Sequence, residues 1–136
     1  MAIELQGLEE IFERLKFAEP AQIEAALGKA CALVERSAKQ KAPKDTGELR
    51  RSISSRVGNE VGEVFTPLEY APYVEYGTGL FAENGGRSDV PWRYQDDAGD
   101  WHSTSGQHPQ PFMRPALDEN REEIIRIFRE VIAEND

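Results

Sequence analysis

Residues 70–79 read Tyr70-Ala71-Pro72-Tyr73-Val74-Glu75-Tyr76-Gly77-Thr78-Gly79 and hold three of the four tyrosines in the chain. Alternation along this stretch predicts a strand over 71–76, with Tyr73 and Glu75 on one face. The glycines that follow end the strand, because they allow backbone angles that a pleated ladder does not use. Pro72 removes one ladder N–H, so the strand is expected to begin there or to lie at a sheet edge. A short aromatic edge is either protected or made to pair with another chain, and we interpret this one as a joint.

Two more strands are predicted upstream. Polar and apolar residues alternate over 50–57, Gly58-Asn59 is a turn signal, and 61–66 fits a return strand. With 71–76, these segments predict a three-stranded antiparallel meander.

Apolar residues at helical spacing predict three amphipathic helices. The first covers 5–15 and ends near Phe17. The second begins at Pro20 and ends before Pro43, so its ~20 residues make an alanine-faced rod of ~30 Å. The third opens at Pro115. The expected fold class is therefore α+β, with a small antiparallel sheet of about three to four strands packed against a long helix, and amphipathic helices at both ends.

Residues 79–110 are a polar, glycine-rich connection that contains both tryptophans. The segments 90–94 and 101–104 flank a turn signal at 97–100 and predict a hairpin with aromatic cross-strand contacts. A connection of this length inside a compact domain is usually functional or disordered. We expect one domain over 1–136, with 80–109 as an extended hairpin insertion.

The composition is that of a globular chain, with 136 residues, 39% of them hydrophobic and 30% charged. No apolar run approaches the ~18 residues that a membrane helix needs, and the first residues lack the layout of a signal peptide, so no membrane contact is expected. Cys31 is the only cysteine, which excludes an internal disulfide and suggests a reducing, cytosolic type of compartment.

The net charge of −9 is unevenly spread, because residues 36–56 hold seven Lys/Arg and only two acids. Such a basic segment can contact phosphate, although an acidic chain repels a duplex at long range. The alternative, which we favour, is that the segment pairs with an acidic neighbouring subunit or with the acidic helices of its own chain.

No set of residues forms a credible catalytic or metal site. Asp45 and Glu48 are a carboxylate pair without a nearby base or metal-ligand companion. His102, His108 and the aspartates of 96–100 match no metal-ligand spacing. We therefore expect no catalytic residue, no metal and no cofactor, and an exposed aromatic strand with a hairpin arm indicates assembly.

Three sequence blocks occur in order. They read Ala42-Pro43-Lys44-Asp45-Thr46-Gly47-Glu48-Leu49-Arg50-Arg51-Ser52-Ile53, Tyr70-Ala71-Pro72-Tyr73-Val74-Glu75-Tyr76-Gly77-Thr78 and Gln110-Pro111-Phe112-Met113-Arg114-Pro115-Ala116-Leu117. Their order and spacing resemble the tailed-bacteriophage neck and tail-completion family, whose members are encoded among the head–tail joining genes. Each block alone is weakly specific, and the resemblance rests on all three together over residues 3–133.

The resemblance implies a virion structural protein, assembled in the host bacterial cytoplasm, that forms a ring between the portal-connector complex and the tail tube. The ring would contain about six copies, or alternatively about twelve, around a channel for DNA. Its partners would be further copies of itself, a head-closure or connector protein, and a tail terminator or tail tube protein. Phage DNA would pass without sequence-specific binding.

A ring subunit needs two different patches, because head-to-tail contacts close only when unlike surfaces meet. We expect the 70–78 strand and the 80–109 hairpin to supply them. The expected interface residues are Tyr70, Tyr73, Glu75, Tyr76, Thr78, Trp92, Trp101, Pro111 and Phe112. For Tyr76 and Trp92, packing in the domain's own core is an equal alternative. Acidic residues, rather than the basic segment, are expected to face the channel, because lysines there would hold phosphates.

Three other functions remain open. A tail-terminator or head-closure ring of a neighbouring neck class would differ in whether it copurifies with tails or capsids. A metal-dependent nuclease would use Asp45 or the acids of 96–100. A regulatory DNA binder would need a basic reading helix, whereas the helices here are acidic or alanine-faced.

Overall fold

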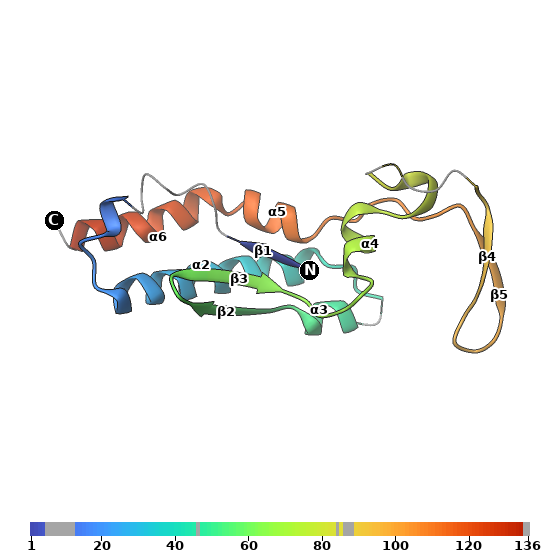
Figure 1. The fold of residues 1–136 in the computed structure, drawn as a ribbon, viewed down its shortest axis with the longest axis horizontal. Helices are drawn as coiled ribbons and strands as arrows, with labels where there is room; N and C mark the ends of the chain where they lie inside the picture. Colours follow the sequence, from blue (N-terminus) through green and yellow to red (C-terminus); the bar gives the residue numbers. More distant parts are fainter. Residues whose placement is uncertain (5–12, 46, 84, 86–88, 135–136) are drawn as a thin grey trace. The chain divides into compact units, whose positions relative to one another are not determined.

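The computed structural model describes residues 1–4, 13–45, 47–83, 85 and 89–134 (Figure 1). The chain forms two compact units, which we describe separately. The first unit comprises Met1–Leu68 and Phe112–Asp136, and the second comprises Glu69–Pro111. In chain order the elements are β1 (Ala2–Glu4), α2 (Pro20–Lys41), α3 (Glu48–Ser52), β2 (Ser54–Gly58), β3 (Val61–Phe65), α4 (Ala71–Tyr76), η1 (Gly79–Phe81), β4 (Trp92–Gln95), β5 (Trp101–Thr104), α5 (Met113–Asp118) and α6 (Arg121–Glu134).

Helix α2 is the scaffold of the first unit, as predicted. It has 22 residues and begins with Pro20, whose missing N–H would have no partner in a first turn. Its N-terminus is fixed by the Glu19 N–H, which donates to Gln22 Oε1 at 3.1 Å. It ends at Lys41, and the C-cap residue Ala42 is extended because a helical residue there would clash with the ring of Pro43.

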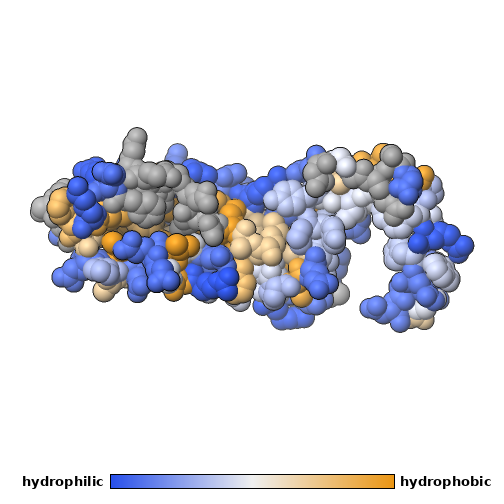
Figure 2. All heavy atoms as spheres, viewed as in Figure 1, coloured by the Kyte–Doolittle hydropathy of each residue, from blue (hydrophilic) through white to orange (hydrophobic). Residues whose placement is uncertain are grey.

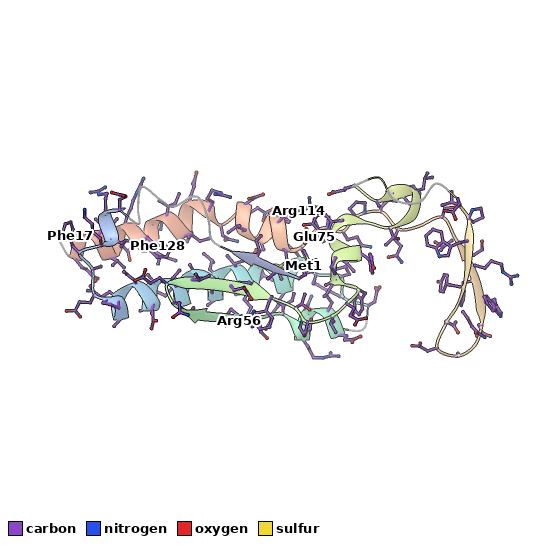
Figure 3. The ribbon with its side chains drawn as sticks, viewed as in Figure 1. Met1, Phe17, Arg56, Glu75, Arg114 and Phe128 are labelled. Atoms are coloured by element: carbon purple, nitrogen blue, oxygen red, sulfur yellow. The ribbon has the colours of Figure 1, made fainter. Side chains whose placement is uncertain are left out.

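One face of α2 carries mainly small side chains into the core, and the sheet, α5 and α6 all contact this helix. The buried members of that face are Ile23, Ala26, Leu27, Ala30, Cys31, Val34, Ser37 and Ala38. Alanines let neighbouring backbones approach closely, so larger side chains from the other elements fill the core. Among them is Phe128 of α6, labelled in Figure 3 and fully buried.

The sheet of the first unit is antiparallel with strand order β1-β3-β2. In the central strand β3, Val64 pairs with Ile3 of β1 on one side and with Ser55 of β2 on the other. Arg56, labelled in Figure 3, forms an ion pair with Glu63 across the β2–β3 ladder, and its guanidinium lies over the Phe65 ring at 4.4 Å. The turn and the return strand predicted at 58–66 are confirmed.

The predicted meander was wrong in its third strand, because residues 71–76 form helix α4 and β1 takes the third place in the sheet. Pro72 lies in the first turn of α4, where the backbone N–H groups have no partner within the helix, so the missing N–H of proline costs no hydrogen bond. The Tyr70 carbonyl accepts the N–H groups of Tyr73 and Val74 at 3.1 and 3.3 Å. Hydrogen bonds within the helix therefore pair the backbone groups that the alternation pattern predicted to pair with a neighbouring strand.

The strand predicted over 50–57 is confirmed only in its second half. Residues Glu48–Ser52 form the short helix α3, which follows the left-handed Gly47, and β2 begins at Ser54. The Ser52 hydroxyl donates to the Leu49 carbonyl at 2.6 Å, a local bond that favours a helical turn over a ladder.

The C-terminal helix was predicted as one element from Pro115 and is instead α5 followed by α6. The break falls at Asn120, whose side-chain Nδ2 donates to the Ala116 carbonyl at 2.7 Å. Asn120 also supplies the carbonyl that accepts the Ile124 N–H at 3.0 Å, so it closes one helix and opens the next.

At the other end, residues 13–15 are helical, and the rest of the first predicted helix lies outside the described residues. The α+β class, with small antiparallel sheets and one long helix, is confirmed. Within the described part of the chain, no helix is both long enough and apolar enough to span a membrane.

Candidate interaction surface

The second unit is held together by a clasp, which we define as residues 77–80 and 104–107. The Thr78 N–H donates to the Gln107 carbonyl at 3.0 Å, and the Gln107 N–H returns to Thr78 Oγ1 at 2.9 Å. The Leu80 N–H donates to the Ser105 carbonyl at 2.8 Å. The clasp joins the segment after α4 to the end of β5.

Two glycines make this close backbone approach possible. Gly106 has φ of 118°, and a Cβ there would lie 2.1 Å from the Thr78 carbonyl oxygen. Gly79 has φ of 61°, and a Cβ there would lie 2.4 Å from the Ser105 carbonyl oxygen. Both positions therefore combine a left-handed backbone with no room for a side chain.

Beyond the clasp, β4 and β5 form the predicted hairpin (Figure 1). Tyr94 faces His102 across the ladder, and their rings stack with centroids 5.3 Å apart. The Arg93 guanidinium lies over the Trp101 ring at 5.4 Å. The aromatic cross-strand contacts expected for this hairpin are thus present, and a cation–π pair accompanies them.

The tip of the hairpin, residues 96–100, is organised by one carboxylate. Asp96 Oδ1 accepts the N–H groups of Ala98 and Asp100 at 3.0 and 2.8 Å, and Oδ2 lies 2.6 Å from His102 Nε2. The hydrogen bond to His102, followed by those from the backbone, lowers the pKa of Asp96 below its usual range. The tip is therefore a turn of defined shape rather than a loose loop.

The helical form of 71–76 changes which interface candidates lie together. In a strand Tyr73 and Tyr76 would point to opposite faces, whereas in α4 they lie three residues apart on one side, next to Tyr70 at the N-cap. Their exposed fractions are 38% for Tyr70, 61% for Tyr73 and 37% for Tyr76. We call these three residues the tyrosine face.

The other candidates divide into accessible and buried side chains. Trp101 is 59% exposed, Pro111 is exposed, and Thr78 and Trp92 are half-buried. Glu75 and Phe112 are each 0% exposed, which corrects their assignment to a surface. Glu75 is buried because the helix turns it away from the tyrosine face, and Phe112 belongs to the core of the first unit.

Sequence reasoning left out two hairpin side chains that the structure exposes, Arg93 and Tyr94. The alternation over 90–94 could have indicated them, because a two-stranded hairpin presents side chains on both faces. Figure 2 shows the visible face of the hairpin mostly in hydrophilic colours, the range in which the charged residues, tyrosine and tryptophan fall.

The structure also places the residues that were considered for a metal or catalytic site. In the described ranges, no three His, Cys, Asp or Glu side chains are placed to hold one metal ion. The two histidines have separate contacts, since His102 bonds Asp96 and His108 lies against Phe81 with ring centroids 3.9 Å apart.

A family model matches residues 8–77, and its description reads "Bacteriophage HK97-gp10, putative tail-component". The match covers just over half of the chain. The chain belongs to the HK97-gp10-like family. The matched segment includes α2, the sheet strands β2 and β3, and α4 with its tyrosine face. No curated protein and no solved structure matches the chain.

Membership in the HK97-gp10-like family gives the chain a structural, tail-related role in a bacteriophage virion, in contact with other phage structural proteins. It supports the resemblance to tailed-phage neck and tail-completion proteins, and a structural role favours a protein without catalytic activity.

Proposed function

We propose that this HK97-gp10-like chain forms a homo-oligomeric ring at the phage head–tail junction, where it joins the portal-connector complex to the tail tube and leaves a channel for DNA. The observation that carries the proposal is the tyrosine face, three partly exposed tyrosines on one side of a six-residue helix within the family-matched segment. Tyrosines are enriched at protein interfaces, because each offers a large, stiff ring and a polar tip.

The hairpin supplies the second patch that a ring subunit needs. It is accessible along both strands, and its exposed Trp101 and Tyr94 are anchors of the same chemical kind. The proposed interface residues are therefore Tyr70, Tyr73, Tyr76, Thr78, Trp92, Trp101 and Pro111. Head-to-tail contacts between unlike patches close into a ring, with about six copies as our expectation and about twelve as the alternative.

Native mass spectrometry of the purified protein, followed by negative-stain imaging of the same sample, tests the ring. A closed ring supports the proposal, as does a monomer that closes only with connector or tail proteins. A chain that stays monomeric or dimeric and binds no virion component contradicts it. Copurification with free tails would favour a tail-terminator position, and copurification with capsids a head-closure position.

A matched pair of variants tests the tyrosine face. Tyr73→Ser should weaken assembly while the chain stays folded, because Tyr73 is 61% exposed. Phe17→Ser is the control, since Phe17 is 74% exposed and lies in the first unit, outside the proposed patches. Equal assembly of the two variants would remove the tyrosine face from the proposed interface.

In the assembled ring we propose that acidic residues line the channel, because a negative wall lets DNA slide whereas lysines would hold its phosphates. Reversing the charge of several acids found to line the channel should slow DNA ejection. Unchanged ejection from intact particles would contradict this arrangement.

A further inference from the structure

The first unit contains a basic cleft, which we define as the hollow lined by Glu35, Arg36, Lys39, Gln40, Lys44 and Arg50. It has a volume of about 400 Å³ and is lined by the C-terminal part of α2, by Lys44 and by Arg50 of α3. Four cations and one carboxylate line it, so its local charge is opposite to that of the chain, whose net charge is −9.

Two of the four cations are already engaged within the cleft. Lys39 forms an ion pair with Glu35 at 3.5 Å, and Arg50 Nε donates to the Lys39 carbonyl at 3.0 Å. The side chains of Arg36 and Lys44 are exposed, and neither has an ion pair or hydrogen bond with another described residue. The cleft therefore presents two uncompensated positive charges to an incoming group.

The hairpin tip carries the opposite charge. Asp96 is used internally, because it holds the turn through Ala98, Asp100 and His102. Asp97 and Asp100 are exposed, and their carboxylates have no side-chain partner among the described residues. A fixed turn thus presents two carboxylates at the end of a two-stranded arm.

We propose that the basic cleft of one copy receives the Asp97–Asp100 tip of a neighbouring copy, as the charged component of a head-to-tail contact. The inference rests on the proposed ring, and it names the surfaces that would meet. Cleft and tip belong to different units of the chain, so the contact joins unlike patches, as ring closure requires. The fixed turn lowers the entropy lost on docking.

A nucleic acid is the weaker candidate for the cleft. A duplex presents a long row of phosphates, whereas the cations here line one recess of about 400 Å³. The net charge of −9 also repels DNA at long range. The two exposed carboxylates on a turn that Asp96 holds in place therefore favour the tip of a neighbouring copy.

Charge reversal in the full-length chain tests the contact. Asp97→Lys with Asp100→Lys and, separately, Arg36→Glu with Lys44→Glu should each weaken self-association about tenfold or more, because like charges then face each other. The chain that carries all four changes should recover to within roughly threefold of wild type, since the two signs are exchanged. Self-association is measured by sedimentation velocity at low and at high ionic strength.

Matched controls change the net charge equally elsewhere. Glu122→Lys with Glu130→Lys, and Arg14→Glu with Arg129→Glu, alter exposed positions outside cleft and tip and should leave self-association unchanged. Far-UV circular dichroism and the thermal midpoint establish that every variant is folded. Controls as damaging as the tip and cleft variants, or no recovery in the exchanged chain, would overturn the proposal.

Disulfide trapping places the two surfaces together directly. A mixture of Lys44→Cys and Asp97→Cys chains should form covalent heterodimers, because a disulfide needs Cα atoms within about 7 Å. Cys31 stays in place in both variants, since its side chain is buried and burial raises the pKa of its thiol. Failure to form heterodimers in self-associating protein, or wild type that does not self-associate even with connector or tail proteins present, contradicts the contact.

The outcomes separate this inference from the proposed ring. If both charge-reversal variants still form rings or attach to tails, the cleft–tip contact is contradicted and the proposed ring is not. Wild-type protein that joins no tail or connector component would remove the proposed ring, whatever the trapping result. A cleft reversal that lowers DNA affinity and leaves self-association unchanged would assign the cleft to nucleic acid and overturn the proposal.

Discussion

Gly62 lies in β3 where the strand passes over α2. A Cβ at this position would lie 2.6 Å from Cys31 Sγ and 3.4 Å from Leu27 Cδ2. Glycine normally weakens a strand, because it loses more backbone entropy on folding than other residues do and has no side chain to pack. At this position it allows the strand to approach the helix more closely than any other residue would.

Gly62→Ala should therefore lower the free energy of unfolding by about 1–3 kcal/mol, the usual cost of an overpacked core. Gly58→Ala is the control, because it adds the same methyl group in the neighbouring strand with nothing within 4 Å. Adding Cys31→Ala to Gly62→Ala should recover part of the loss by removing the clashing sulfur. Denaturant unfolding measures all three, and equal effects at Gly62 and Gly58 would contradict the crowding.

Asp96 supports the hairpin tip through its charged form. Its pKa is lowered mainly by the hydrogen bond with His102, so it should titrate below the usual range of an aspartate. A lowered pKa in the folded state means that the carboxylate contributes stability above its unfolded pKa and loses it as the pH falls through the folded pKa. The tip should therefore loosen only in acid, below about pH 4.

The carboxyl carbon of Asp96, followed by NMR, gives the titration midpoint. His102→Ala should raise it toward the ordinary value, because the strongest stabilising hydrogen bond is lost. His108→Ala should leave it unchanged, since His108 packs on Phe81 instead. A titration midpoint of Asp96 that is the same in His102→Ala as in wild type would show that the backbone donors alone set the pKa.

At the scale of elements, the clasp joins the turn after α4 to the end of β5. Its backbone hydrogen bonds cross where Gly79 and Gly106 leave no room for a Cβ. The hairpin is therefore attached to the rest of the second unit mainly by main-chain hydrogen bonds, with the Thr78 hydroxyl as one side-chain acceptor.

Gly106→Ala should open the clasp, because the new methyl group would lie 2.1 Å from the Thr78 carbonyl oxygen. Gly99→Ala is the matched control. It has φ of 90° and the same left-handed strain of about 1–2 kcal/mol, but its nearest neighbour, Gln95 Nε2, is 3.7 Å away. Hydrogen exchange at the Thr78, Leu80 and Gln107 amides should accelerate in Gly106→Ala alone. Equal exchange in the two variants would mean that strain, not crowding, governs the clasp.

At the scale of the whole molecule, one question is whether the two units unfold together. Both tryptophans, Trp92 and Trp101, lie in the second unit, whereas the long helices α2 and α6 lie in the first. Tryptophan fluorescence and helical circular dichroism therefore report on different units of the same chain. The expectation of a single domain over 1–136 predicts that the two signals change with one midpoint.

Phe128→Ala sharpens this test. Its ring is fully buried in the first unit, so its loss should cost about 3–5 kcal/mol. In a single cooperative domain the tryptophan transition should shift by the same amount as the helical one. A tryptophan midpoint that stays at its wild-type value would establish two independently folding units.

The sequence alone determined the elements whose signals are local. Helix α2 was predicted with its ends because Pro20 and Pro43 act on their own neighbouring turns. The hairpin at 92–104 and the turn before β3 were predicted because their turn residues and alternation lie close together in the chain. The family was likewise indicated by three sequence blocks. The block at residues 42–53 lies wholly inside the segment that the family model matches.

Only the tertiary structure decided which segment became the third strand and which candidate side chains are accessible. The pattern at 71–76 fits either a strand or a short helix, and β3 found its second partner in residues Ala2–Glu4, 61 positions or so away in sequence. Burial of Glu75 and Phe112 depends on neighbours that are distant in the chain. The same holds for the basic cleft, since residues 35–40 and 44–50 meet only where the chain turns after α2. Local propensity fixes turns and helix ends, whereas pairing and burial are properties of the packed chain.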